Sequence, residues 1–303
     1  MTRAALGDVD LPEHLPTLTR APRDYAVLIG NSRYRHLPAN MNVAYALYDR
    51  RLMQRLAEQT LGVPTANIVG DTEDLTSGQM RLLLGEPGGE GKLHELIRAS
   101  GGADTVYFYY SGHGMPDPRD ADNAYLLPVD AAPSDAGRLG YSLHALYGQL
   151  ARLQARRFVV MLEACFSGRS DSLVVRQGGL GLLPGTSALL LAPELPERPD
   201  ERFLVYSASR GDELANWLSV NRHGLFTSFL VKGLAGEADD GDGRLTSGEL
   251  RDFVQARVAA TALRYPQARR QNPQLLGSPD EVLVDFAMED MGRSASAERE
   301  KGR

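Results

Sequence analysis

Short continuous runs of apolar residues recur along the chain and alternate with segments of helical periodicity. Runs of this kind are typical of strands buried on both faces of a parallel sheet. They occur at residues 24–31, 67–70, 105–111, 157–164 and 202–209, and a further extended segment at 124–130 is typical of a hairpin arm. Helical segments fall at residues 43–61, 76–84, 90–100, 142–153, 224–236 and 246–265. This alternation predicts an α/β fold, with a mostly parallel central sheet flanked by helices on both faces.

Three segments lack a clear period. Residues 1–22 contain several prolines and predict a flexible leader, and residues 288–303 predict a disordered tail. Residues 169–202 are rich in Gly, Pro and Ser, and so long an irregular loop within a compact domain indicates either function or disorder. We therefore expect one domain over residues 23–287 that contains a mobile linker at 169–202.

The composition narrows the class of protein. A hydrophobic fraction of 43% in 303 residues is sufficient for a large buried core. The net charge of -6 argues against nucleic acid as the main partner. One cysteine allows no intramolecular disulfide, no apolar run is long enough to span a membrane, and the N-terminus lacks a signal-peptide pattern. We expect a soluble cytoplasmic protein without membrane or nucleic-acid partners.

Two reactive side chains follow two of the expected strands. His113 follows the third strand within YYSGHG, and Cys165, the single cysteine, follows the fourth within EACFSG. In doubly wound sheets, ligands bind beyond the carboxyl ends of the strands, so adjacent strands would direct both side chains into one crevice. A neutral imidazole can remove the thiol proton, and the amides of Gly114 and Cys165 would stabilise an oxyanion. Alone, a buried cysteine and a turn histidine would be the simpler interpretation; their matched placement favours a catalytic pair.

The two motifs, with His113 and Cys165 separated by 52 positions, resemble those of caspase-like cysteine peptidases, in particular the bacterial metacaspase-like branch. YAVLIGNSRY, NAYLLPVD, RHGLFTSFLVKGLAGEADDGDGRLTSGELRDFV and QNPQLLG are also similar to that family, so the resemblance covers residues 23–286. It implies the caspase-haemoglobinase fold and a dyad that hydrolyses peptide bonds, with His113 as general base and Cys165 as nucleophile. We expect no required cofactor, while the resemblance includes some metacaspases that need calcium.

The resemblance also implies a pocket for a basic side chain. Glu163 stands where the family usually has an Asp that binds the basic residue at the cleavage point; it keeps the charge and is one methylene longer. A carboxylate at the end of a buried strand needs a cation or several donors, which a substrate guanidinium or an internal Arg would supply. Asp49 is expected in the same pocket. The alternative is that it is a solvated carboxylate on its helix, beside Arg50. Trp217 is expected to form a wall of the pocket. The alternative is that its ring packs in the hydrophobic core.

Two loops carry further candidates. A protease that prefers basic residues could cleave its own linker after Arg, so the Arg residues there are candidate sites of self-cleavage. The alternative is an ordinary mobile loop that is not cleaved. These residues are Arg169, Arg176, Arg198 and Arg202. ADDGDGRLTSGE (238–249) resembles an EF-hand loop, but its first position is Ala238, which has no ligating side chain. We interpret it as the start of a helix and predict no metal site; a calcium requirement is not supported by a complete site.

The sequence thus predicts a cytoplasmic cysteine endopeptidase that cleaves proteins after Arg, with Lys as the second basic residue, and that is activated by a separate protein, a proteolytic cut or an ion. Relatives of this kind are associated with bacterial stress, cell-death and anti-phage defence signalling. One alternative is a catalytically silent scaffold that acts by partner binding, although the intact dyad argues against it. Another is an acyl hydrolase using the same thiol, against which the two pocket acids favour a basic peptide.

Overall fold

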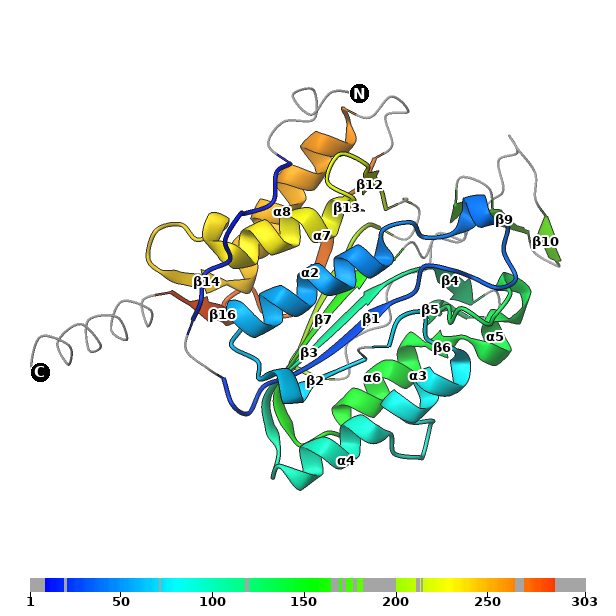
Figure 1. Ribbon diagram of the computed structural model, residues 1–303, viewed down its shortest axis with the longest axis horizontal. Coiled ribbons are helices and arrows are strands. Elements are labelled where there is room, and N and C mark those ends of the chain that lie inside the picture. Colours follow the sequence, from blue (N-terminus) through cyan, green and yellow to red (C-terminus); the bar gives the residue numbers. More distant parts are fainter. Residues whose placement is uncertain are drawn as a thin grey trace, which may run out of the picture.

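A six-stranded sheet forms the centre of the molecule, with strand order β15-β11-β7-β3-β1-β2 (Figure 1). The computed structural model describes residues 9–18, 21–70, 72–117, 120–164, 169–170, 173–176, 179–181, 200–210, 213, 215–264 and 270–286. The sheet strands are β1 (Tyr25–Gly30), β2 (Ile68–Val69), β3 (Ala103–Ser111), β7 (Ala155–Glu163), β11 (Phe203–Ser207) and β15 (Gln274–Leu276). All neighbouring pairs are parallel except β11 and β15, which confirms the mostly parallel sheet predicted from the apolar runs.

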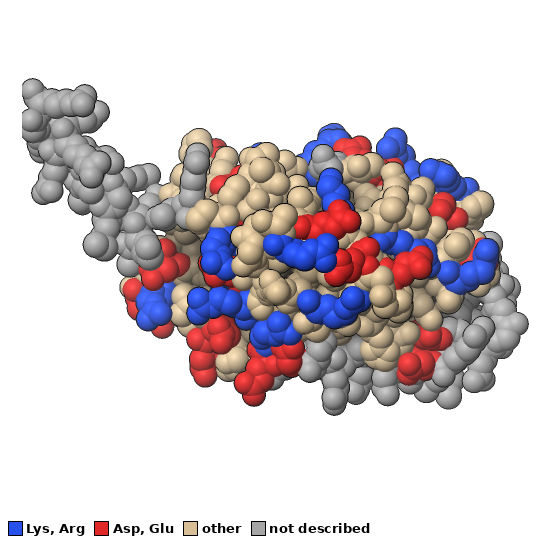
Figure 2. Space-filling view, turned by 90° about the horizontal axis from the view of Figure 1, so that it is seen from below, with Lys and Arg blue, Asp and Glu red and all other residues tan. Residues whose placement is uncertain are grey.

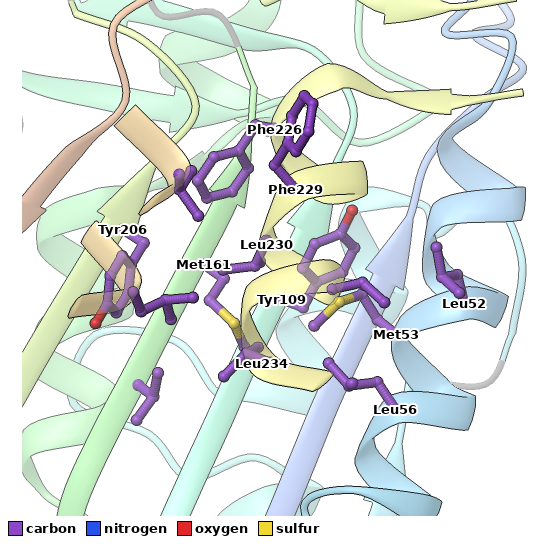
Figure 3. Packing of buried hydrophobic residues seen from close by; sticks show 14 of the residues in the cluster. Leu52, Met53, Leu56, Tyr109, Met161, Tyr206, Phe226, Phe229, Leu230 and Leu234 are labelled. Atoms are coloured by element: carbon purple, nitrogen blue, oxygen red, sulfur yellow. The ribbon is translucent and has the colours of Figure 1, made fainter. Parts of the chain in front are cut away.

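Helices cover both faces of this sheet and create two cores (Figure 1). One face carries α2 (Ala46–Gln59), α7 (Leu225–Lys232) and α8 (Ser247–Ala262); the other carries α3 (Ser77–Leu84), α4 (Lys92–Ala99) and α6 (Leu143–Ala151). Successive strand residues serve opposite cores, as the period of a strand requires: Tyr109 packs against the first group of helices and Tyr110 against the second. Figure 3 shows part of the first core, where Tyr109 and Met161 lie beneath the side chains of α2 and α7.

Helix boundaries follow the capping residues in the sequence. Ser142 is the N-cap of α6, and its hydroxyl accepts a hydrogen bond from the Ala145 amide at 3.0 Å, as predicted. Thr76 and Thr246 open α3 and α8 with complete capping boxes. The last turn of α7 continues into a π-helical segment, Gly233–Glu237.

The smaller elements lie around the sheet. They are β4 (Gly114–Asp117), β5 (Asp120–Leu126) and β6 (Tyr141–Ser142) in one sheet; β12 (Trp217–Leu218) with β13 (His223–Gly224); β14 (Arg244–Thr246) with β16 (Val282–Asp285); α5 (Ala136–Leu139); and the 3-10 turns Ala39–Met41, Thr65–Asn67 and Pro133–Asp135. The hairpin arm expected at 124–130 corresponds to β5, which pairs with both β4 and β6.

The linker contains more regular structure than its composition indicates. Three short strands, β8 (Arg169–Ser170), β9 (Leu173–Arg176) and β10 (Gly179–Gly181), form an antiparallel sheet of their own. The prediction of an irregular loop is therefore wrong for this part, because the run Leu173-Val174-Val175 is too short to show a period. Residues 182–199 and the predicted tail at 288–303 lie outside the described residues.

The segment predicted as a flexible leader is packed where the structure describes it. Val9 is fully buried in the core beneath α2 and α7, and Leu11, Leu15 and Leu18 pack against the same core. The backbone is also fixed, because the Leu18 amide donates to the Gln59 carbonyl at 3.0 Å. For residues 9–18 the prediction is wrong: their apolar side chains follow no regular spacing, and only the tertiary fold reveals that they share a face.

On the face shown in Figure 2, acidic and basic side chains are interspersed, in keeping with a net charge of only -6. Within the described part of the chain, none of the helices has the length and apolar character needed to cross a membrane.

Replacing Val9 by Ala tests the packing of the N-terminal segment. Because Val9 is fully buried, we expect the substitution to lower the free energy of unfolding by about 2 kcal/mol. Urea unfolding monitored by circular dichroism measures this change. The matched control is Leu263→Ala, whose side chain is 60% exposed and whose effect should stay below about 0.5 kcal/mol. Equal stability of Val9→Ala and the wild type would show that the segment is not held in the core.

Candidate active site

The register between two central strands brings the predicted catalytic segments to the same edge of the sheet. β3 and β7 are parallel neighbours, and their last residues, Ser111 and Glu163, stand opposite each other. His113 and Cys165 each follow two residues later, and the Gly112 amide donates to the Glu163 carbonyl at 3.3 Å. The adjacency of the two strands is thus confirmed. Cys165 itself lies outside the described residues, so the distance between thiol and imidazole stays a prediction.

The environment of His113 favours a neutral ring. Its Nε2 lies 2.7 Å from the backbone carbonyl oxygen of Met41. A carbonyl oxygen only accepts, so we assign the ring proton to Nε2, which leaves Nδ1 as a proton acceptor. Burial lowers the pKa of His113, and the bond to Met41 only partly opposes this effect. A ring that is neutral near pH 7 and has one nitrogen available is suited to act as a general base.

Two tyrosine hydroxyls fix the backbone around the histidine. The His113 amide donates to Tyr34 Oη at 2.7 Å, and Tyr110 Oη donates to the His113 carbonyl at 2.8 Å. The rings of Tyr34 and His113 are tilted against each other with centroids 4.6 Å apart. A Cβ on Gly112 would come within 2.8 Å of Tyr34 Oη, so this turn needs glycine for space. Gly114 follows as the first residue of β4; its predicted oxyanion role, like that of Cys165, stays a prediction.

Asp49 is buried at the same edge of the sheet rather than solvated on its helix. Its carboxylate is fully buried and accepts from His223 Nδ1 at 2.8 Å, from the Gly224 amide at 3.1 Å and from Ser111 Oγ at 3.1 Å. The alternative of a solvated carboxylate beside Arg50 is therefore wrong. Burial raises the pKa of Asp49, and the bonds from His223, Gly224 and Ser111 oppose that increase.

Glu163 lies in the same cluster with fewer donors. The residue is 2% exposed, and Oε2 accepts from the Thr227 amide at 2.7 Å and the Thr227 hydroxyl at 2.8 Å. Its other oxygen, Oε1, has no hydrogen-bond partner among the described residues. Burial, and secondly the charge of Asp49, raise the pKa of Glu163 to about 8. Within the described part of the chain no Arg pairs with it, so the alternative of an internal salt bridge finds no support there.

The β12–β13 hairpin lies over these two acids. Gly224 packs so closely on the Glu163 carboxylate that a Cβ at this position would collide with it. Trp217 pairs with Gly224 across the hairpin and is 36% exposed, so the alternative of core packing does not describe it. The structure thus places Trp217 on the element that covers Glu163 and Asp49, while its contact with substrate stays a prediction.

Several contributors to this site were missed by sequence reasoning. The Met41 carbonyl has no sequence signature, because every residue offers one. Tyr34, His223 and Thr227 lie inside quoted segments, YAVLIGNSRY and RHGLFTS, but were interpreted only as strand, turn and helix. The available signals were polar residues at the start of an apolar helix: His223 precedes α7, and Thr227 lies in its first turn.

The candidate self-cleavage residues have different surroundings. Arg202 forms an ion pair with Asp200 at 2.7 Å, and its guanidinium donates to the carbonyl oxygens of Ala151 at 2.9 Å and Ala155 at 3.2 Å. Cleavage after Arg202 would require these contacts and the start of β11 to open, which disfavours that position. Arg169 and Arg176 lie in β8 and β9. Arg198 lies outside the described residues.

The acidic loop at 238–249 serves as the start of a helix, as interpreted from the sequence. Glu249 accepts from the Thr246 amide at 2.7 Å and completes the capping box of α8. Asp242 accepts from the Arg244 amide at 2.7 Å and thus folds back onto its own loop. Carboxylate oxygens of Asp239, Asp240 and Glu249 lie within 4.8 Å of one another, but the cap already occupies the glutamate. The absence of a metal requirement stays a prediction.

Comparison with known proteins agrees with this geometry. A family model described as the caspase domain matches residues 23–283, so the chain belongs to the caspase domain family. Among solved structures, the fold is similar to that of caspase-1 from Spodoptera frugiperda, with a TM-score of 0.52 and 14% sequence identity over 90% of this chain and 96% of that one. A search of curated proteins finds no match. As a member of the caspase domain family, the protein is a cysteine endopeptidase.

Tyr34→Phe tests the support of the histidine loop. The substitution leaves the buried His113 amide without its acceptor, so we expect kcat to fall about tenfold while KM changes less than about twofold. The matched control is Tyr147→Phe, because the buried Tyr147 hydroxyl lacks a hydrogen-bond partner in the described structure and lies far from the site. Equal kcat values for the two variants would contradict a role for the Tyr34 hydroxyl.

Glu163→Gln tests the strain in the acid cluster. Because the folded pKa is raised, the stabilising effect of protonated Glu163 is complete below about pH 4.5 and is lost as the pH rises through about 8. We therefore expect the variant to gain stability over the wild type with increasing pH, on the order of 5 kcal/mol at pH 9 and close to zero at pH 4. Denaturant unfolding across this range measures the difference, with the exposed Glu201→Gln as control. A difference that does not depend on pH would contradict the raised pKa.

Proposed function

We propose that the protein cleaves peptide bonds after Arg, and after Lys with lower efficiency, by means of a His113–Cys165 dyad. His113 Nδ1 accepts the thiol proton, and Cys165 Sγ attacks the carbonyl carbon of the scissile bond. The amides of Gly114 and Cys165 hold the oxyanion, and protonated His113 returns the proton to the leaving amine. Water then hydrolyses the acyl-enzyme.

The observation on which the basic specificity rests is the second oxygen of Glu163. It belongs to a buried carboxyl group at the end of the strand that leads to Cys165, and no described residue donates to it. Because burial and Asp49 raise the pKa of Glu163 to about 8, ionising the group is costly at neutral pH, and a guanidinium would relieve that cost through charge-assisted bonds. Asp49 next to it adds negative charge to the same region. Arg is favoured over Lys because its planar fork reaches a carboxylate with two donors.

The site is closed in this structure, which supports a regulated enzyme. Glu163 is only 2% exposed, and Gly224 lies directly over its carboxylate. The groups around Oε1 must shift before a substrate side chain can enter, whereas Gly224 lies against Oε2, the oxygen that Thr227 already occupies. We propose that a separate protein, an ion or a cut in the linker triggers this shift, with Arg169, Arg176 and Arg198 as the candidate cleavage positions. On the family resemblance, we place the enzyme in the cytoplasm, in stress, cell-death or anti-phage defence signalling.

Hydrolysis of fluorogenic peptides that end in Arg, Lys or Asp tests the proposed activity. We expect cleavage after Arg by the wild type, with kcat/KM for Lys lower by about tenfold because one of the two donors is lost. Cys165→Ala and His113→Ala should each reduce kcat by at least about a thousandfold. The assay is run with and without calcium, which tests the ion as trigger.

The remaining outcomes separate the parts of the proposal. Cleavage after Asp would keep the enzyme class and contradict the role of Glu163. Activity that persists in Cys165→Ala would contradict the dyad. Inactivity on all three peptides, even after a cut in the linker, would favour the scaffold that acts by partner binding.

A further inference from the structure

The two buried acids at the carboxyl edge of the sheet differ in how far their oxygens are satisfied. Both oxygens of Asp49 accept hydrogen bonds. Oδ1 accepts from His223 Nδ1 at 2.8 Å and the Gly224 amide at 3.1 Å, and Oδ2 accepts from Ser111 Oγ at 3.1 Å and, at 3.3 Å, from the same Gly224 amide. Asp49 is also fully buried. An entering cation would have to displace donors that the fold already provides.

Glu163 shows the opposite arrangement. Only Oε2 is occupied, by the amide and hydroxyl of Thr227, while Oε1 is buried without a donor from any described residue. The cost of leaving this oxygen unpaired is removed when a donor arrives. A substrate cation therefore gains more at Glu163 than at Asp49.

His223 links the β12–β13 hairpin to these acids. It is the first residue of β13, its side chain is 10% exposed, and its ring packs edge-on against Tyr48 at 6.5 Å. Its Nδ1 and the amide of the next residue, Gly224, both point at Asp49 Oδ1. The pair of donors fixes the backbone of Gly224, which in turn lies against Glu163.

We propose that Asp49 is not a ligand of the substrate but the anchor of the β12–β13 hairpin. In this arrangement His223 is a positioning residue: with Asp49 it forms a buried acid–histidine pair that holds Gly224 beside Glu163. Glu163 alone then offers its unpaired oxygen to the basic side chain. This inference rests on the proposed cleavage after basic residues, and it assigns different tasks to two acids that the sequence places in one pocket.

Because charged and titratable groups face Asp49, the proposed division of tasks predicts how the activity on basic peptides depends on pH. The groups around it are Glu163 from β7, His223 from β13, and Tyr109 from β3, whose hydroxyl lies 2.7 Å from Thr227 Oγ1; Tyr48 of α2 packs on the histidine. The charge of Asp49 makes Glu163 harder to ionise. Asp49→Asn keeps an acceptor for His223 and Gly224 and removes that charge, so Glu163 should ionise at lower pH.

The first experiment compares Asp49→Asn with Glu163→Gln on Arg and Gln peptides of the same sequence. Glu163→Gln should raise KM for the Arg peptide about 50-fold. Asp49→Asn should raise KM less than about fivefold and should move the rise of the Arg-to-Gln ratio of kcat/KM to lower pH. The ratio cancels the titration of His113 and Cys165, which both peptides share. An Asp49→Asn variant as impaired in KM as Glu163→Gln would overturn the inference.

The second experiment addresses His223. His223→Ala removes the donor and should lower kcat/KM for the Arg peptide about 20-fold. His223→Asn places an amide N–H near the position of Nδ1 and should restore kcat/KM to within about threefold of wild type. In the double variant Asp49→Ala/His223→Ala, the loss should be smaller than the sum of the losses in Asp49→Ala and His223→Ala, since each single substitution already removes the one contact that the two residues share. Additive losses, or failure of Asn to rescue, would contradict the positioning role.

Thermal unfolding of the wild type, Asp49→Ala, His223→Ala and the double variant Asp49→Ala/His223→Ala separates this inference from the proposed function. An unfolding coupling between Asp49 and His223 reports the anchor in the whole chain without any substrate. Wild-type protein that cleaves no basic peptide would refute the proposed function, while a coupled pair in unfolding would still establish the anchor. Wild-type protein that cleaves after Arg but shows no coupling would refute the anchor alone.

Discussion

The surrounding structure depends on one constraint: Asp49 and Glu163 are buried side by side, and hydrogen-bond donors reach both oxygens of Asp49 but only one oxygen of Glu163. His223, Gly224 and Ser111 all turn their donors toward Asp49. Glu163 receives only the donors of Thr227, and its pKa rises because burial and its neighbour both oppose ionisation. The unmet requirement for a donor lies at the end of the strand that leads to Cys165. A cost of this kind in stability is typical of a site that is built for a charged ligand.

The parallel sheet brings the histidine segment, the cysteine segment and the two acids to one edge. Pairing of Ser111 with Glu163 aligns the ends of β3 and β7, so the histidine and cysteine segments start from equivalent positions. The Met41 carbonyl and the Tyr34 hydroxyl then orient the imidazole and its backbone from a separate segment of the chain. The proposed base and the acid cluster are thus held by different elements at one edge of the sheet.

Much of this arrangement could be predicted from local sequence. The sheet could be predicted because buried strands appear in the sequence as continuous apolar runs. The start of α6 could be predicted because Ser142 is a favourable N-cap residue. The placement of His113 and Cys165 after adjacent strands follows from those runs and the family resemblance. The burial of Asp49 could not be predicted, because its partner His223 is 174 positions away and such contacts have no period. Val9 was missed for the same reason: its partners come from other elements.

Comparison of an Arg peptide with its citrulline counterpart tests the central claim most directly. Citrulline is close to Arg in shape, but it lacks the charge and has a carbonyl oxygen in place of one donor group, so the ratio of the two kcat/KM values measures the demand of the pocket for a charged donor. The account predicts a ratio of at least about a hundredfold in the wild type, and a ratio near one in Glu163→Gln. Equal cleavage of both peptides by the wild type, or an unchanged ratio in the variant, would contradict the role given to the unpaired oxygen of Glu163.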